Sequence, residues 1–159
     1  MTDPTPLRRD PLDVLIVEDE ALLAEELGFL VREAGLRDVG HAMSSAEAVD
    51  LACRLTPDLA LVDVHLKDGP TGVDAARLIV EDCGAVVLFM TANVKRLPED
   101  FAGACGVIGK PYSEHAVKTA LAYLEVCVRR GHAPGPPPLG LVLAPRFREL
   151  WGDGFAQAG

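Results

Sequence analysis

Short runs of apolar residues alternate along the chain with longer segments in which apolar positions recur every three or four residues. The apolar runs predict strands over residues 13–17, 39–43, 59–64, 85–91 and 106–109. Continuous runs of this kind, without polar alternation, are typical of parallel strands that are covered on both faces. The helical spacing predicts helices over about 21–34, 45–55, 72–82 and 114–129, and a short, weakly patterned helix near 97–103.

Local signals mark the ends of several predicted helices. Gly35 is a suitable C-terminal cap for the first helix. Ser44 and Glu47 have the spacing of a capping box at the start of the second helix, and Ser113 can cap the last one. Five β–α units predict an α/β fold, in which right-handed crossovers place helices on both faces of a parallel sheet. In such folds the working site lies at the carboxyl ends of the strands.

The pattern divides the chain into three parts. Residues 1–12 form an N-terminal extension, 13–130 form the α/β domain, and 131–159 form a Pro/Gly-rich linker with a short apolar tail. Prolines in residues 133–138 prevent a helix and favour a stiff, extended linker. The apolar tail, which includes Phe147, Trp151 and Phe155, is too short for a second domain. It either docks on its own domain or binds a partner or a neighbouring protomer.

Charge and composition exclude several classes of function. The 159 residues carry a formal net charge of −9, which disfavours binding to nucleic acid or to anionic lipid. The apolar runs are too short to cross a membrane, and the N-terminus lacks the pattern of a secretion signal. We therefore expect a cytoplasmic protein. Four scattered cysteines show no metal-binding spacing, and we expect them to be reduced and to fill core space: Cys53, Cys83, Cys105 and Cys127.

Charged and polar side chains stand at the ends of four predicted strands. Glu18 and Asp19 follow the first strand, and Asp63 ends the third. Thr91 ends the fourth strand and Lys110 follows the fifth. The fold should bring these side chains to one edge of the sheet, although they are up to 92 positions apart. Three clustered carboxylates favour a bound cation such as Mg²⁺, and a carboxylate beside a lysine can take up a phosphoryl group.

Four segments resemble the signature segments of response-regulator receiver domains from two-component signalling. These are residues 14–20, 61–66, 90–92 and 109–112, and the resemblance covers roughly residues 13–129. It implies a flavodoxin-like, doubly wound five-stranded parallel sheet of order 2-1-3-4-5 with five helices. It also implies a cis peptide bond between Lys110 and Pro111.

The resemblance assigns a role to each residue of the site. Asp63 would be the phosphoacceptor, with Thr91 as the switch threonine and Lys110 as the lysine that contacts the phosphate. Glu18, Asp19, Asp63 and the backbone carbonyl of His65 would hold Mg²⁺. The side chains of His65 and Asn93 stand at positions that tune the lifetime of the phosphate in this family.

Two positions depart from the family pattern. Val107 stands where receiver domains usually carry Tyr or Phe, so the usual coupling between threonine and an aromatic ring is in doubt. Output through the loop after the fourth strand is one alternative, and an activation that depends little on aromatic burial is another. The second departure is the glycine-rich loop over residues 67–72, which could give Asp63 different access.

The leading functional hypothesis is a stand-alone response regulator, not an enzyme beyond its own phosphorylation and dephosphorylation. A histidine kinase or a phosphotransfer protein would donate the phosphoryl group. No helix-turn-helix follows residue 130, so output would run through contacts with an unknown protein target or through a homodimer. The homodimer would use the fourth and fifth helices, that is 97–103 and 114–129, or the tail. The alternatives are an aspartyl-phosphate phosphatase, which would need an acid where His65 stands, and a receiver-like binding module that is not phosphorylated.

Overall fold

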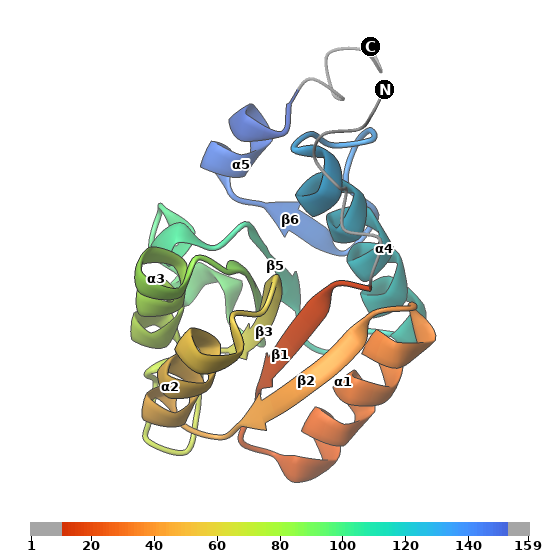
Figure 1. Cartoon of the computed structure of the whole chain (residues 1–159). Coiled ribbons are helices and arrows are strands. Elements are labelled where there is room, and N and C mark those ends of the chain that lie inside the picture. Colours follow the sequence, from red (N-terminus) through yellow and green to blue (C-terminus); the bar gives the residue numbers. More distant parts are fainter. Residues whose placement is uncertain (1–10, 153–159) are drawn as a thin grey trace.

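The computed structural model describes residues 11–152, which form a sheet between two layers of helices (Figure 1). The strands are β1 (Asp13–Val17), β2 (Arg37–Ala42), β3 (Leu59–Asp63), β4 (Val86–Thr91), β5 (Gly106–Gly109) and β6 (Leu141–Leu143). The α-helices are α1 (Ala21–Glu33), α2 (Ser45–Leu55), α3 (Gly72–Cys83), α4 (Glu114–Arg130) and α5 (Pro145–Leu150). Two 3₁₀ turns, η1 (Val94–Arg96) and η2 (Phe101–Gly103), lie between β4 and β5.

The predicted sheet order is confirmed, and one strand is added. The order is β2-β1-β3-β4-β5-β6, in which the first five strands are parallel. The additional strand, β6, comes from the C-terminal segment and pairs antiparallel with β5, so that Ile108 lies opposite Leu141. The sheet therefore has six strands, because the exposed edge of β5 is covered by the chain's own tail.

The apolar core consists of two clusters, one on each face of the sheet. On one face α1 and α4 cover Val14 and Ile16 of β1. On the other face α2 and α3 cover Leu15 and Val17 of the same strand. Successive side chains of a strand point to opposite faces, so a strand covered on both faces is apolar at every position. This arrangement explains the unbroken apolar runs in the sequence.

The predicted helix starts and the predicted cis bond are confirmed. The Ser44 hydroxyl accepts a hydrogen bond from the backbone N–H of Glu47 at 3.2 Å. The Ser113 hydroxyl likewise accepts from the N–H of Ala116 at 3.0 Å. Each bond satisfies one of the backbone donors that a helix N-terminus leaves free. The peptide bond between Lys110 and Pro111 is cis.

The segment between β4 and β5 differs from the predicted helix over 97–103. It contains the two 3₁₀ turns, and Phe101 and Ala102 have positive φ values of 54° and 53°. Pro98 has no backbone N–H to donate, and left-handed residues cannot continue a right-handed helix, so a longer helix is interrupted here. Within residues 11–152 the fifth α-helix lies in the C-terminal segment, which the sequence did not predict.

The C-terminal segment docks on its own domain, which was one of the two predicted alternatives. Trp151 is buried, and its carbonyl accepts a hydrogen bond from the N–H of Ala133 at 2.8 Å. The phenol of Tyr123 on α4 donates to the carbonyl of Gly135 in the linker at 2.8 Å. The first bond joins the two ends of the segment to each other, and the second ties the start of the segment to α4. Residues 1–10 of the predicted N-terminal extension and Phe155 of the tail lie outside the described residues.

The prediction of four reduced cysteines is wrong for two of them. Cys53 of α2 and Cys83 of α3 form a disulfide. Cys105 and Cys127 are free and buried in the core, as predicted. Spacing along the chain could not reveal the pair, because it depends on how α2 packs against α3. Among residues 11–152 every helix is too short or too polar to span a bilayer.

Candidate functional site

The predicted site residues come together at the carboxyl ends of the strands. A cavity of about 290 Å³ opens there, and it is lined by Glu18, Asp19, Glu20, Asp63, His65, Ala92 and Lys110. The lining residues come from the ends of β1 and β3 and from the segments that follow β4 and β5. The geometry of parallel strands explains this gathering, since their carboxyl ends meet at one edge of the sheet.

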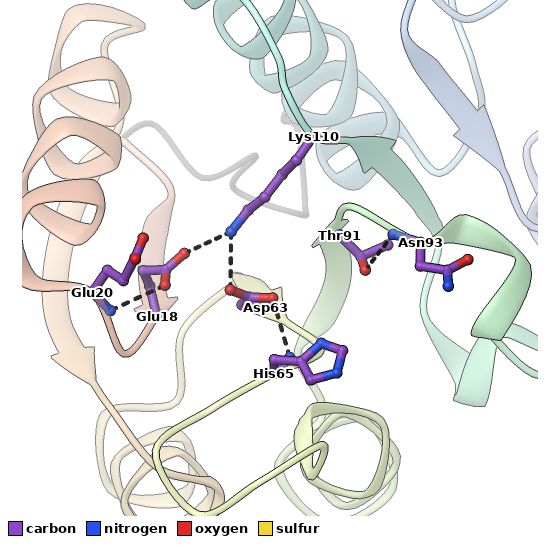
Figure 2. Close-up of polar contacts among 7 residues, drawn as sticks. All are labelled: Glu18, Glu20, Asp63, His65, Thr91, Asn93 and Lys110. Atoms are coloured by element: carbon purple, nitrogen blue, oxygen red, sulfur yellow. Dashed lines mark hydrogen bonds and ion pairs between the residues drawn. The ribbon is translucent and has the colours of Figure 1, made fainter.

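Lys110 connects the two buried carboxylates of the cavity. Its Nζ lies 3.1 Å from Oε1 of Glu18 and 2.9 Å from Oδ2 of Asp63, as Figure 2 shows. Glu18 is 2% exposed and Asp63 is 8% exposed. Burial disfavours the charge of Lys110, but its hydrogen bonds and ion pairs with Asp63 and Glu18 outweigh that effect and raise the pKa of Lys110. The ammonium therefore supplies a fixed positive charge between two acidic groups.

The surroundings of the Glu18 carboxyl group shift its pKa strongly. Burial is the main reason that its pKa rises from 4.5 to about 7, and the neighbouring charge of Asp63 adds to the rise. The backbone N–H of Glu20, at 3.1 Å from Glu18 Oε2, and the ammonium of Lys110 act in the opposite direction. The buried carboxylate is therefore costly to ionise without a further positive charge nearby.

Three carboxylates of the cavity can approach a single cation. One oxygen each from Glu18, Asp19 and Asp63 lie within 4.8 Å of one another. Carboxylate oxygens are the ligands that Mg²⁺ prefers in proteins, and the remaining cavity volume leaves room for the waters that this ion keeps. The donor set thus fits a hard divalent cation.

The backbone around Asp63 is closely packed. The N–H of His65 donates to Oδ1 of Asp63 at 3.2 Å, so the two carboxylate oxygens have different partners. A Cβ at position 72 would collide with the carbonyl oxygen of Asp63, so Gly72 permits the start of α3 to lie against the end of β3. His65 itself is exposed at the cavity rim, and its imidazole extends away from Glu18 (Figure 2). The role of its backbone carbonyl as a metal ligand stays a prediction.

Thr91 and Asn93 stand at the same edge of the sheet. Thr91 is buried, and its hydroxyl oxygen accepts a hydrogen bond from the N–H of Asn93 at 3.1 Å (Figure 2). The hydroxyl proton of Thr91 is therefore free to be donated to another oxygen. The carbonyl of Thr91 accepts from the backbone N–H of Lys110 at 2.8 Å, which joins the ends of β4 and β5. Asn93 is exposed, and its side chain lies at the surface.

Val107 is fully packed in the core. It pairs with Phe89 of β4 on one side and with Val142 of β6 on the other. It is buried in the cluster under α2 and α3. A side chain in this position, without a ring and without access to solvent, cannot alternate between an exposed and a buried orientation as a surface aromatic residue can.

Asp68 is a residue whose role the sequence did not reveal. Its carboxylate accepts hydrogen bonds from the hydroxyl and the backbone N–H of Ser45 and from the hydroxyl of Thr71. These bonds tie the loop after Asp63 to the first residue of α2. The hydroxyls of Ser45 and Thr71, followed by the backbone N–H of Ser45, lower the pKa of Asp68 from 3.8 to about 2. Only the tertiary structure brings Ser45 within reach of this loop.

Substitution of Asp68 should destabilise the domain in a pH-dependent manner. A carboxyl whose pKa is lowered by folding stabilises the folded state above its unfolded pKa, and that contribution is lost as the pH falls through the folded pKa. We expect Asp68→Asn to be less stable than the wild type at pH 6, with a difference that shrinks between pH 4 and pH 2. Urea unfolding at several pH values measures this, and exposed Asp74→Asn is the control. A stability difference between the wild type and Asp68→Asn that stays constant from pH 6 to pH 2 would contradict the lowered pKa of Asp68.

Comparison with known families agrees with this geometry. Residues 14–122 match the response regulator receiver domain. The chain therefore belongs to the family of receiver domains from two-component signalling.

Individual relatives show the same likeness. The chain is 37% identical over 123 residues to the transcriptional regulatory protein PdtaR of Mycobacterium tuberculosis, a match that covers 76% of this chain and 58% of that protein. It is 33% identical to the phyllosphere-induced regulator PhyR of Methylorubrum extorquens, with 76% and 47% covered. The chain thus spans about half the length of these curated relatives.

Solved structures agree on the fold. The receiver domain of PhyR from Erythrobacter litoralis is 30% identical and superposes with a TM-score of 0.66, covering 76% of this chain and 94% of that one. A LuxR-family response regulator from Aurantimonas, at 22% identity, has a TM-score of 0.64 over 94% of this chain and all of that one. The second likeness shows the fold alone.

Proposed function

We propose that the protein is a single-domain response regulator that accepts a phosphoryl group on Asp63 from a histidine kinase or a phosphotransfer protein. The reaction depends on Mg²⁺, and the phosphorylated domain signals through protein–protein contacts. The observation that supports this proposal best is the position of Asp63, whose carboxylate lies in the cavity with the acidic pair Glu18 and Asp19 and forms an ion pair with the ammonium of Lys110. Membership of the receiver family supports the same reaction.

The side chains have distinct parts in the proposed transfer. A carboxylate oxygen of Asp63 attacks the phosphorus of a phosphohistidine, a P–O bond forms, and the P–N bond breaks as the imidazole leaves and takes up a proton. Before the transfer the ammonium of Lys110 is hydrogen-bonded to Asp63. After the transfer it can contact a negatively charged oxygen of the new phosphoryl group. The proton of the Thr91 hydroxyl can be donated to a second oxygen.

Glu18, Asp19 and Asp63 would hold the divalent cation. When bound, Mg²⁺ offsets the repulsion between the carboxylates and neutralises phosphate oxygens during transfer. The cation would favour the ionised form of Glu18, whose pKa is raised by burial. Asp19 is less buried than the other two and offers a third carboxylate to the same ion.

Removal of the Asp19 carboxylate should weaken Mg²⁺ binding. We expect Asp19→Asn to bind Mg²⁺ at least about tenfold more weakly, since an amide oxygen carries no full charge to balance the ion. Isothermal titration calorimetry with MgCl₂ measures the affinity directly. The control is Glu25→Gln, which removes an exposed carboxylate of α1 outside the cavity. Equal losses in both variants would indicate a general effect of surface charge instead.

The output of the phosphorylated state is proposed to run along β5. Val107 cannot act through a moving ring, but β5 connects Lys110 to the C-terminal segment, because Val107 pairs with Val142. A shift of Lys110 toward a phosphate would therefore reach β6. The proposed partners are a target protein or a second copy that contacts α4 or the C-terminal segment. A dimer through an α-helix over 97–103 is not supported, since the helical structure within that segment is a single 3₁₀ turn, Phe101–Gly103.

Incubation with a small phosphodonor such as acetyl phosphate tests the proposal. The expected result is a single phosphoryl group per chain that appears only with Mg²⁺ and that hydroxylamine removes, as it does an acyl phosphate. Repeated hydrolysis of phosphomonoesters would favour the aspartyl-phosphate phosphatase. Absence of labelling from acetyl phosphate and from purified histidine kinases would favour a binding module that takes no phosphate.

A further inference from the structure

The disulfide between Cys53 and Cys83 joins the two helices on one face of the sheet. The residues are 30 positions apart in sequence, and their Cα atoms lie 4.9 Å apart. This separation falls within the range that disulfide bonds require. Cys53 stands in the last part of α2 and Cys83 is the final residue of α3. The bridge therefore connects the C-terminal ends of these helices.

The pair is accessible to reagents in solution. Cys53 is exposed and Cys83 is half-buried. The other two cysteines are different, because Cys105 and Cys127 are both buried in the core. Burial raises the pKa of both thiols, so their reactive thiolate forms are disfavoured. An oxidant added to the folded protein should thus reach the Cys53–Cys83 pair first.

The fold can accommodate the reduced form of the pair. The carbonyl oxygen of Val49 lies 3.9 Å from Sγ of Cys83 and can accept a weak hydrogen bond from a thiol. The two helices also pack together without the bridge, because buried Ala48 and Ala52 of α2 belong to the same apolar cluster as Ala76 and Ile79 of α3. Breaking the bridge should therefore loosen this layer without dismantling it.

We propose that Cys53 and Cys83 form a reversible redox site, at which a peroxide or a disulfide oxidant links α2 to α3. With a peroxide, the thiolate of Cys53 attacks the O–O bond and becomes a sulfenic acid, and the second oxygen leaves as water after protonation. The thiol of Cys83 then displaces the sulfenic oxygen as water, and the S–S bond forms. The peroxide takes up the two electrons, and a dithiol reductant returns them to the pair.

The bridge joins the two helices that contact the loop after Asp63. Asp68 of that loop holds the N-terminal end of α2 through Ser45, and the loop ends where Gly72 begins α3. With the disulfide closed, α2 and α3 are also fixed at their C-terminal ends. The oxidised form should therefore hold this layer more rigidly than the reduced form does.

Mass spectrometry and thermal unfolding test the proposal on the full chain. Protein reduced with dithiothreitol and then treated with one equivalent of hydrogen peroxide should lose about 2 Da, and two of its four thiols should remain for alkylation after denaturation. Peptide mapping should find the Cys53–Cys83 link. The melting temperature should rise by about 10 °C on oxidation, because the bridge closes a loop of about 30 residues in the unfolded chain.

The variants Cys53→Ser and Cys83→Ser should show neither the mass loss nor the rise in melting temperature. The peptide map is made on the wild-type protein, so it tests the proposal even if a substitution prevents a variant from folding. Unchanged mass after oxidation, or a disulfide that involves Cys105, Cys127 or a second chain, would overturn the proposal. These readouts are independent of phosphorylation, so they leave the proposed function unaffected.

Discussion

Replacement of Asp63 with asparagine should abolish phosphorylation of the protein. The asparagine amide has nearly the same shape as the carboxylate, but it lacks the negative charge and the nucleophilic oxygen that attack phosphorus. We expect wild-type protein to be labelled by acetyl phosphate and Mg²⁺, and Asp63→Asn to remain at the background. Separation of phosphorylated and unphosphorylated chains on a phosphate-affinity gel measures the difference.

Two measurements make this prediction decisive. Asp82→Asn is the matched control, because it makes the same chemical change at an exposed position near the end of α3, and Asp82 does not line the cavity. It should be labelled like the wild type. Circular dichroism should show that Asp63→Asn keeps its fold, since Lys110 retains Glu18 as a partner. Labelling of Asp63→Asn at the wild-type rate would show that another residue is the phosphoacceptor.

Truncation of Trp151 should cause a large loss of stability. The indole is 4% exposed and meets Phe147 edge-on, with ring centroids 4.8 Å apart. It belongs to the core cluster that also contains Leu143 of β6 and Tyr123 of α4. Removal of a buried Trp side chain costs about 3–5 kcal/mol, since contacts are lost and a cavity remains. We expect Trp151→Ala to lower the free energy of unfolding by up to that amount.

The loss of unfolding free energy in Trp151→Ala has an upper limit, and amide hydrogen exchange can show whether that limit is reached. If the C-terminal segment undocks while the rest stays folded, the global loss cannot exceed the free energy of docking, and the backbone amides of β6 will exchange faster. Chemical unfolding and amide exchange together measure both effects. Leu150→Ala is the control, because this neighbouring side chain is 59% exposed and should change stability by less than about 0.5 kcal/mol. Similar losses in the two variants would show that Trp151 is not the anchor.

The C-terminal segment also shows where prediction from the sequence ended. Residues 141–143 are too few for a periodic pattern, and their pairing depends on the free edge of β5. The turns between β4 and β5 were missed as well, since the positive φ values of Phe101 and Ala102 leave no clear signal in residue type. The Cys53–Cys83 pair and the contact of Asp68 with Ser45 depend on how α2 packs, which spacing along the chain does not encode.

Patterns along the chain were sufficient to predict the five parallel strands, the capped helix starts and the gathering of Glu18, Asp63 and Lys110 at one edge. Burial on both faces makes each strand apolar throughout, and the topology of parallel strands then brings their carboxyl ends together. The sixth strand, the disulfide and the distances within the site could be seen only once the chain was folded. These features come from contacts between segments remote in sequence, and they depend on the free edge of a sheet and the spacing of packed helices.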